Sequence, residues 1–566
     1  MRRHRSPGLD RRSFMAYFSA LGLSGSLFPG ILWARMQEAS LTKEMVADAE
    51  RLAGLTFTDH EREMMLEGLT ANRRAYHRLR EAPIPNDIPP AVRFDPQLPG
   101  TEPQVEDRPF RPSRPGPVAR PGTSEEVAFS PVTVLGELIR TRQISSEELT
   151  RLYLDRLERY GPELEAVITL TDGRALRQAR EADREIAHGR YRGPLHGIPW
   201  GAKDLLAVDG YPTTWGARPY AGQEIDADAT VVRRLDDAGA VLVAKLTLGA
   251  LAMGDYWFAG RTRNPWNLDQ GSSGSSAGSA AATVAGLVGF AIGSETLGSI
   301  VSPSTRTGAT GLRPTFGRVS RAGAMALSWT MDKLGPLCRS VEDCALVLHA
   351  IHGADGRDPT ARTVPFPWDG EAGVHGIRVG YVPEAFQGDE GTAAFDRGAL
   401  DAIRELGVEP VPVSLPDQFP LDALQLILSA EGAAAFDDLT RTGQDDELVR
   451  QTAGSWPNLF RTARFIPAVE YLQANRVRTM VMGAMDAALA GVDVLVTPSF
   501  AEGVLLMTNL TGHPAVVVPS GFRPGGTPVS FSFVGGLWKD AEALRLAKAY
   551  QDATGHHLKH PPRFRG

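Results

Sequence analysis

The stretch DQGSSGSSAGSAAATVAG, residues 269–286, decides how this 566-residue chain is interpreted. Five serines alternate with glycine and alanine before a run of small residues. Glycine permits backbone conformations closed to other residues, and hydroxyls clustered at a helix start bind an anion or each other. A phosphate-binding loop is disfavoured because the Lys-Ser/Thr ending of such loops is absent. Residues 271–294 are uncharged and long enough to span a bilayer, but their small residues favour a close-packed interior loop and helix.

The segment that follows, GFAIGSETLGSIVSPS at 289–304, places a serine on a glycine turn. Ser299 follows Gly298 after an apolar run that predicts a strand. Consecutive N–H groups from Thr296 to Ser299 on such a turn would converge on one point, which is what an oxyanion hole requires. By itself, a serine in a glycine turn predicts only the turn.

Upstream, GPLHGIPWGAKDLL at 193–206 places Lys203 at the end of an apolar approach that we expect to be strand-like and buried. Burial disfavours the charged form of a lysine, so its pKa falls and the amine can serve as a base. The adjacent Asp204 would oppose this effect if its carboxylate approached the amine.

Together these segments resemble the amidase signature family. GIPWGAKD is similar to the family's lysine motif, SSAGSAAA to its SSGGSAAA, and GSETLGS to its GTDTGGS. GLRPTFGRVSRAG, DKLGPLCRSVEDC, DVLVTPS and LTGHPAVVVPSGF are similar to later stretches of the family in the same order. The resemblance runs from about residue 131 to 555. It implies one large α/β/α domain, with a mixed central sheet covered by helices and preceded here by a small helical segment.

The resemblance also assigns a Ser–cis-Ser–Lys triad. Ser299 would be the nucleophile that forms the acyl-enzyme, and Lys203 the neutral base. Ser275, preceded by Gly274 in a cis peptide bond, would carry the proton between them. The resemblance implies that the oxyanion is held by four N–H groups, those of Thr296, Leu297, Gly298 and Ser299.

Three positions depart from the family pattern. Leu297 stands where glycine is usual, Glu295 replaces aspartate, and Val301 replaces an arginine that normally follows the nucleophile. A side chain at position 297 is expected to narrow the acyl pocket or to strain the turn. The triad is retained, so the departures bear on substrate binding and turn geometry rather than on the reaction class.

The expected function is hydrolysis of a non-peptide carboxylic amide to a carboxylate and ammonia or an amine. Two alternatives remain open: a catalytically inactive amide-binding protein, with Leu297 blocking the oxyanion site, and a glutamine amidase like that of the tRNA-dependent amidotransferases. A third reading takes residues 274–278 as the G-x-S-x-G elbow of an α/β-hydrolase with Ser276 as nucleophile. That elbow requires a hydrophobic strand directly before it, and the residues here predict a loop.

The amino terminus has the layout of a targeting segment, predicted at 1–34. Arg11 and Arg12, followed by Ser-Phe-Met and an apolar run, resemble the twin-arginine export signal. We therefore expect a periplasmic or extracellular protein. No clean A-x-A cleavage site follows, so retention of the segment as a membrane tether stays open.

Three further segments are predicted. Residues 41–80 have helical spacing for two helices, with Thr58 and Glu61 as a capping box. Residues 81–130 are rich in proline and predict an extended strap or linker. Residues 131–560 are predicted to form the enzyme domain.

The composition limits the partners. With 42% hydrophobic and 22% charged residues and a net charge of −7, the chain is globular and has no basic footprint for nucleic acid. Only Cys338 and Cys344 are present, and both are expected to be core thiols. No metal-ligand spacing occurs, so we expect neither metal nor organic cofactor. The expected partner is a small amide, with a homodimer as an open alternative and no stable membrane insertion unless the signal is retained.

Overall fold

The structure, a computed structural model, describes residues 41–80, 85–88, 90, 92–103, 105–114, 116–387, 391–501 and 503–565. The export signal predicted at 1–34 lies outside these residues. The chain divides into two compact units, Met1–Pro85 and Asn86–Gly566. In the described residues no helix combines the length and the apolar character that crossing a membrane requires.

The first unit contains the two predicted helices, α3 (Lys43–Ala53) and α4 (Asp59–Arg80). α3 ends at Gly54, whose φ of 66° lies in the left-handed region that favours glycine. Before α4, the N–H of Glu61 donates to Thr58 Oγ1 at 3.3 Å, and the N–H of Thr58 donates to Glu61 Oε2 at 2.6 Å. This reciprocal pair is the predicted capping box, which satisfies N–H groups that a helix start leaves unpaired.

The second unit is built on an 11-stranded sheet with the order β1-β3-β2-β8-β10-β9-β14-β15-β13-β11-β12. The sheet is mixed, as predicted: β2 runs parallel to β3 and β8, whereas β10 runs antiparallel to β8 and β9. Its strands are β1 (Val167–Leu170), β2 (Pro199–Lys203), β3 (Val241–Leu246), β8 (Phe290–Glu295), β9 (Thr310–Arg313), β10 (Lys333–Cys338), β11 (Val379–Tyr381), β12 (Val411–Pro412), β13 (Val494–Pro498), β14 (Ala515–Phe522) and β15 (Pro528–Gly535).

Two hairpins lie apart from this sheet, formed by β4 (Tyr256–Trp257) with β5 (Gly260–Arg261) and by β6 (Arg263–Asn264) with β7 (Asn267–Gly271). The α-helices of the second unit are α5 (Ser124–Phe129), α6 (Val132–Arg140), α7 (Ser146–Leu164), α8 (Asp172–Ala187), α9 (Thr230–Asp237), α10 (Ala277–Val284), α11 (Val301–Thr307), α12 (Val341–Ile351), α13 (Ala393–Glu405), α14 (Gln425–Ala435), α15 (Asp437–Arg441), α16 (Trp456–Ala463), α17 (Ala468–Leu489), α18 (Val504–Thr511) and α19 (Asp540–Thr554).

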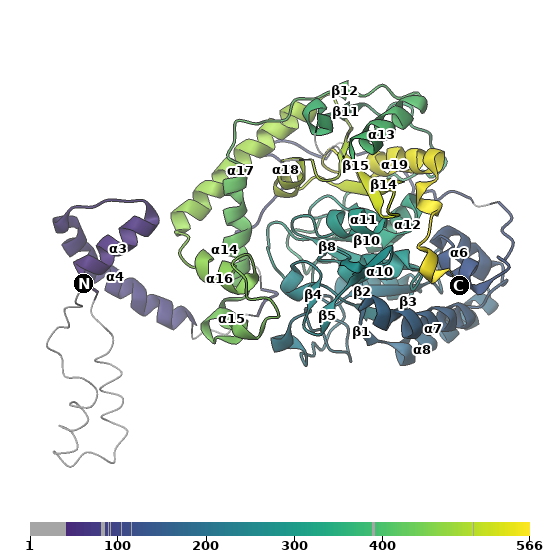
Figure 1. Ribbon diagram of the computed structural model, residues 1–566, viewed down its shortest axis with the longest axis horizontal. Helices are drawn as coiled ribbons and strands as arrows, with labels where there is room; N and C mark the ends of the chain where they lie inside the picture. The colour runs from purple at the N-terminus through teal and green to yellow at the C-terminus, as the bar shows by residue number, and fades with distance from the viewer. Residues whose placement is uncertain are drawn as a thin grey trace, which may run out of the picture. The chain divides into compact units, whose positions relative to one another are not determined.

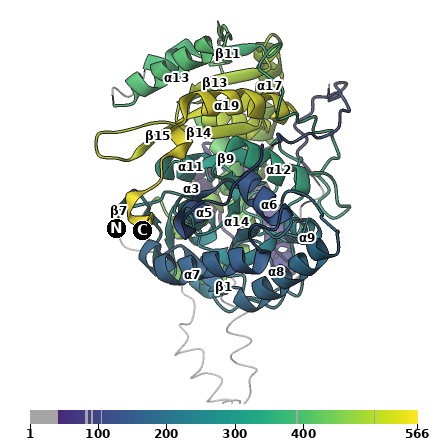
Figure 2. The ribbon, with the colours of Figure 1, turned by 90° about the vertical axis from the view of Figure 1, so that its right-hand side faces the viewer.

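Helices cover both faces of the sheet (Figure 1). Neighbouring residues of β10 show the division, because side chains alternate along a strand. Leu337 packs in one cluster with residues of α10, whereas Cys338 packs in another with residues of α12. Cys338 and Cys344 are both buried free thiols, as predicted. Figure 2 shows α7 and α8 side by side at one end of the second unit and α13 at the other.

The proline-rich segment is tied to the enzyme body from Asn86 onward. The Asn86 amide donates to the carbonyls of Ala326 and Ala435, at 2.9 and 3.3 Å. Further along, Trp538 Nε1 donates to Gln97 Oε1 at 2.9 Å. These contacts bridge residues hundreds of positions apart in the sequence, so this part of the segment packs on the body.

Candidate active site

Lys203 is the last residue of β2, in the interior of the sheet between β3 and β8. All five residues of β2 are buried, as the apolar approach predicts, and the Lys203 side chain is 0% exposed. The strand therefore carries a long cationic side chain into a site closed to bulk water.

Three serine hydroxyls surround the Lys203 amine. Its Nζ lies 2.8 Å from Ser275 Oγ, 2.9 Å from Ser294 Oγ and 3.0 Å from Ser276 Oγ. The Ser276 hydroxyl donates to the Ser294 carbonyl at 3.0 Å, so it accepts from the amine. A neutral amine has two N–H donors and one lone pair. Donors directed at Ser276 and Ser294 leave that lone pair for the Ser275 hydroxyl.

The environment favours a neutral Lys203. Burial lowers its pKa well below the ordinary lysine value, while the charges of Asp332 and Glu295 oppose the shift. Among the described residues no carboxylate pairs with its Nζ. Asp204 instead lies 2.7 Å from Lys245 Nζ, so the opposing effect considered for Asp204 does not arise through direct contact.

The peptide bond between Gly274 and Ser275 is cis. A Cβ on Gly274 would lie 1.9 Å from the Gly254 carbonyl oxygen, so a larger residue does not fit. The Ser-rich segment then enters α10, whose residues are all buried. Small side chains thus allow the close approach of backbone that brings Ser275 to Lys203, and the segment is the interior loop and helix that its composition predicts.

Ser276 is fully buried, with its hydroxyl in use. Besides contacting Lys203 and the Ser294 carbonyl, its Oγ accepts the N–H of Ser294 at 3.1 Å. The segment before it, predicted as loop, is the β6–β7 hairpin, which does not belong to the central sheet. These surroundings argue against a nucleophile elbow and make Ser276 a structural partner of Lys203.

Ser299 lies on the turn that joins β8 to α11. Its carbonyl accepts the N–H of Ser276 at 3.1 Å, which places it beside the Ser275 loop. Its side chain is 8% exposed and makes no hydrogen bond to another described residue. The N–H groups of 296–299 likewise bond to no described residue, so four donors remain available on one short turn.

The turn accommodates Leu297 without strain in the left-handed region. Gly298 carries the positive φ of 82°, whereas Leu297 is not among the described residues with positive φ. A leucine in the ordinary region needs no special backbone freedom. The expected strain is therefore absent, and Leu297, half-buried, leaves the four N–H groups unblocked by hydrogen bonds.

Glu295 spans the base of this turn. Its Oε2 accepts the N–H groups of Ile300 and Val301 at 2.7 and 2.9 Å. Its Oε1 lies 2.8 Å from Arg313 Nη1 and accepts from the Asn509 amide at 2.9 Å. Burial raises its pKa, but Arg313, Lys333 and these hydrogen bonds lower it further, to about 2. The carboxylate thus fastens both ends of the turn together.

The structure brings Lys203, Ser275 and the Ser299 turn together. The sequence reasoning missed Ser294 as a partner of Lys203. Because β2 and β8 are parallel neighbours, their carboxyl ends meet at one edge of the sheet, and the strand pairing alone would have placed Ser294 near the amine. Within the described residues no group of His, Cys, Asp and Glu side chains has an arrangement that would hold a metal ion.

The substrate-binding region is less sharply defined. Tyr256 and Trp257, considered for the acyl pocket, form β4 of a hairpin, and Trp257 is buried. A cavity of about 1260 Å³ elsewhere is lined by Arg306, Asp396 and Ser530, among others, and by no member of the triad. Its size alone does not make it the reaction site, since the reactive groups lie outside it.

Comparisons with known proteins agree with this geometry. A family model described as Amidase matches residues 148–544. The amidase-type component of the glutamyl-tRNA(Gln) amidotransferase of Moorella thermoacetica is 35% identical over 477 residues, covering 75% of this chain and 97% of that protein. The same component from Roseiflexus castenholzii is 36% identical over 475 residues, covering 75% and 96%. The crystal structure of a peptide amidase from Stenotrophomonas maltophilia superposes with a TM-score of 0.69 and 32% identity, covering 78% and 99%.

Proposed function

Because this chain belongs to the amidase family, we propose that it hydrolyses linear carboxylic amides through an acyl-enzyme on Ser299. One observation carries the proposal: a buried lysine amine without a carboxylate partner lies 2.8 Å from Ser275 Oγ, beside a turn with four unpaired N–H groups. A base, a relay hydroxyl, a nucleophile and oxyanion donors are the parts that acyl transfer requires.

Acylation transfers one proton along the triad. Neutral Lys203 takes the proton of the Ser275 hydroxyl, Ser275 takes that of Ser299, and Ser299 Oγ attacks the amide carbon. The N–H groups of the 296–299 turn stabilise the oxygen that becomes negative. The tetrahedral intermediate collapses as the C–N bond breaks, and the proton held by Lys203 returns through Ser275 to the leaving nitrogen.

Deacylation repeats these steps with water. Water gives a proton through Ser275 to Lys203 while its oxygen attacks the acyl carbon. The C–O bond to Ser299 then breaks, and the proton returns to Ser299 Oγ. The products are a carboxylic acid, ionised at neutral pH, and the ammonia or amine released earlier.

A second candidate is hydrolysis of glutamine as part of an amidotransferase. The two curated relatives described above are components of such an enzyme, and nearly their whole length is matched. The same triad would release ammonia from a side-chain amide. The chain's own resemblance to an export signal argues against a tRNA-bound acceptor, so we place simple amide hydrolysis first.

Active-site labelling tests the proposal. We expect a fluorophosphonate to modify Ser299 and Ser299→Ala to lose both the adduct and the hydrolysis of amides. Ser276→Ala serves as the matched hydroxyl control, and its Ser299 adduct should remain. The panel comprises an aliphatic amide, an aromatic amide, an amidated dipeptide and glutamine, with ammonia release as the measurement.

The outcomes separate the candidates. Turnover of glutamine alone would favour the amidotransferase role, and an adduct on Ser276 would contradict the triad. A folded protein that binds amides without forming an adduct would support the inactive binding protein considered from the sequence.

Export is a separate proposal that rests on residues 1–34. In a bacterium with the twin-arginine route, we expect the full chain in the periplasmic fraction and retention in the cytoplasm when Arg11 and Arg12 are both changed to lysine. Changing Arg2 and Arg3 to lysine keeps the same net charge and should leave export intact. Equal retention of both double variants, or a cytoplasmic parent protein, would contradict the proposal.

A further inference from the structure

A loop outside the triad contacts the oxyanion turn. Thr296, the first residue after β8, donates its hydroxyl to Asp332 Oδ1 at 2.6 Å. Thr296 is 6% exposed, and its backbone N–H is the first of the four unpaired donors. The hydroxyl contact restrains the residue whose N–H has to point at the developing oxyanion.

The second oxygen of Asp332 closes its own loop. Oδ2 accepts the N–H groups of Leu327 and Ser328, at 2.8 and 3.0 Å. Both carboxylate oxygens are thus engaged, one by the oxyanion turn and one by the loop 327–332. Movement of this loop would be passed directly to Thr296.

Helices α14 and α17 hold the loop from one side. Glu431 of α14 accepts the Ser328 hydroxyl at 2.6 Å and the Thr330 hydroxyl at 2.9 Å. Arg478 of α17 donates to the Thr330 hydroxyl and carbonyl, at 2.9 and 2.8 Å. All of these side chains are buried, so the anchorage is shielded from water.

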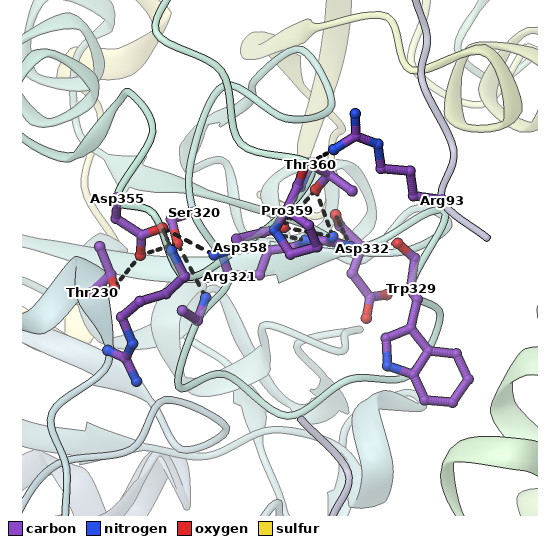
Figure 3. Close-up of polar contacts among 12 residues, drawn as sticks. Arg93, Thr230, Ser320, Arg321, Trp329, Asp332, Asp355, Asp358, Pro359 and Thr360 are labelled. Carbon is purple, nitrogen blue, oxygen red and sulfur yellow. Dashed lines mark hydrogen bonds and ion pairs between the residues drawn. The ribbon is translucent and has the colours of Figure 1, made fainter. Parts of the chain in front are cut away.

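Arg321 holds the loop from another side (Figure 3). Its Nη1 donates to the Trp329 carbonyl at 2.8 Å. Its Nε lies 2.9 Å from Asp358 Oδ2, and its Nη2 donates to the Thr360 hydroxyl at 2.7 Å. The loop is therefore fixed on both sides, and Asp332 transmits that rigidity to the oxyanion turn.

We propose that Asp332 is a positioning residue for amide hydrolysis, aligning the oxyanion donors through its contact with the Thr296 hydroxyl. The inference rests on the proposed function, since it needs an oxyanion at this turn. It adds to that function a residue outside the triad and the turn, held in place by segments far away in the sequence.

Asp332 also bears on the base. The negative charges that face Lys203 belong to Asp332 and Glu295, and both raise the pKa of Lys203 against the effect of burial. Glu295 is compensated by Arg313 and Lys333, whereas Arg321 is the cation that favours the charged form of Asp332. Removing the Asp332 charge should therefore lower the Lys203 pKa further, and the neutral amine would persist to lower pH.

Asp332→Asn separates charge from contact. Asparagine can keep its oxygen on the two loop N–H groups and donate its amide to Thr296 Oγ1, which then accepts. We expect a modest loss of kcat and a shift of the acid limb of kcat/KM to lower pH. Asp332→Ala loses the contact as well, and we expect kcat to fall about 10- to 100-fold with little change in KM, somewhat less than loss of an oxyanion donor itself.

Thr296→Val supplies a second route to the same contact. It keeps the side-chain shape but removes the hydroxyl, so its kcat should fall to a similar extent, without the pH shift. The double variant Asp332→Ala with Thr296→Val should be no slower than the worse single variant, because both remove one interaction.

Asp355→Asn is the matched control. Asp355 accepts the hydroxyls of Thr230 and Ser320, at 2.5 and 2.6 Å, and two backbone N–H groups, but does not contact the loop 327–332 (Figure 3). Its kcat and acid limb should match those of the parent protein.

The measurement is kcat and KM across pH on the amide that the parent protein hydrolyses best, with fluorophosphonate labelling as a check of folding. A parent protein that neither labels nor hydrolyses any amide would overturn the proposed function. An active parent whose Asp332→Ala and Thr296→Val variants keep the parent kcat would overturn only the positioning role. A fall confined to KM would do the same, because it would make Asp332 a substrate-binding group.

Discussion

Lys203→Ala should lower kcat for amide hydrolysis by about 10⁵-fold, the scale on which a serine triad loses rate without its base. The amine is the proton acceptor nearest to Ser275, at 2.8 Å, and its other neighbours are serine hydroxyls and the Ser294 carbonyl. No described group stands in its place. Steady-state rates and fluorophosphonate labelling measure the loss.

The acid limb of kcat/KM reports the state of the base. Because burial lowers the Lys203 pKa well below its ordinary value, the limb should lie well below pH 10, and activity should persist at neutral pH. Activity requires the neutral amine, so it falls as the pH drops through that pKa. Lys203→Arg, which stays protonated at any accessible pH, should be as inactive as the alanine variant.

Lys245→Met is the control for burial of a lysine. Lys245 is also 0% exposed, but it pairs with Asp204 rather than with the serines. Its loss leaves a buried carboxylate unpaired and should lower stability, while kcat stays near the parent value. A small primary amine added to Lys203→Ala should restore part of the rate. Retained activity in Lys203→Arg would contradict a neutral base.

Local pattern was sufficient to predict much of this fold. Apolar runs closed by proline predicted β13 and β14, and the cap serine of α7 is Ser145, whose hydroxyl accepts the N–H of Glu148. The family resemblance, rather than periodicity, carried the triad residues, because Lys203 and Ser299 are separated by many elements that only the sheet order brings together.

The support around the site could not be predicted in the same way. Glu431 and Arg478 reach the loop 327–332 from helices about a hundred residues or more away in the sequence, and no spacing rule links them. The role of Glu295 was also missed. A carboxylate after a strand signals neither its arginine partner nor its contacts with the next helix, because both depend on tertiary packing.

Glu295→Gln should reduce the free energy of unfolding by about 3 to 5 kcal/mol, the effect of breaking a buried ion pair from one side. Glu295 and Arg313 are both 0% exposed, and their atoms lie 2.8 Å apart. The uncharged amide leaves the guanidinium without its counter-ion and turns one acceptor into a donor facing other donors. Urea unfolding measures the change, with Glu137→Gln as an exposed-pair control expected below about 1 kcal/mol.

The pH dependence identifies the charge as the cause. Glu295 has a pKa of about 2 when folded and an ordinary value of 4.5. A depressed folded-state pKa contributes stability above the unfolded value and loses it as the pH falls through the folded one. The difference between the parent protein and Glu295→Gln should therefore be full near pH 7 and shrink below about pH 4.5. A difference that stays constant down to about pH 3 would point to lost shape complementarity instead.

The same substitution should also reach the chemistry. Glu295 accepts the N–H groups of Ile300 and Val301, so it fixes the segment that follows Ser299 as well as the strand that precedes the turn. Replacing Arg313 by methionine in the Glu295→Gln background should recover part of the stability, because the unpaired charge is gone. It should not recover kcat, since the bonds that close the turn depend on the carboxylate. Recovery of both would mean that the ion pair stabilises the fold without shaping the oxyanion site.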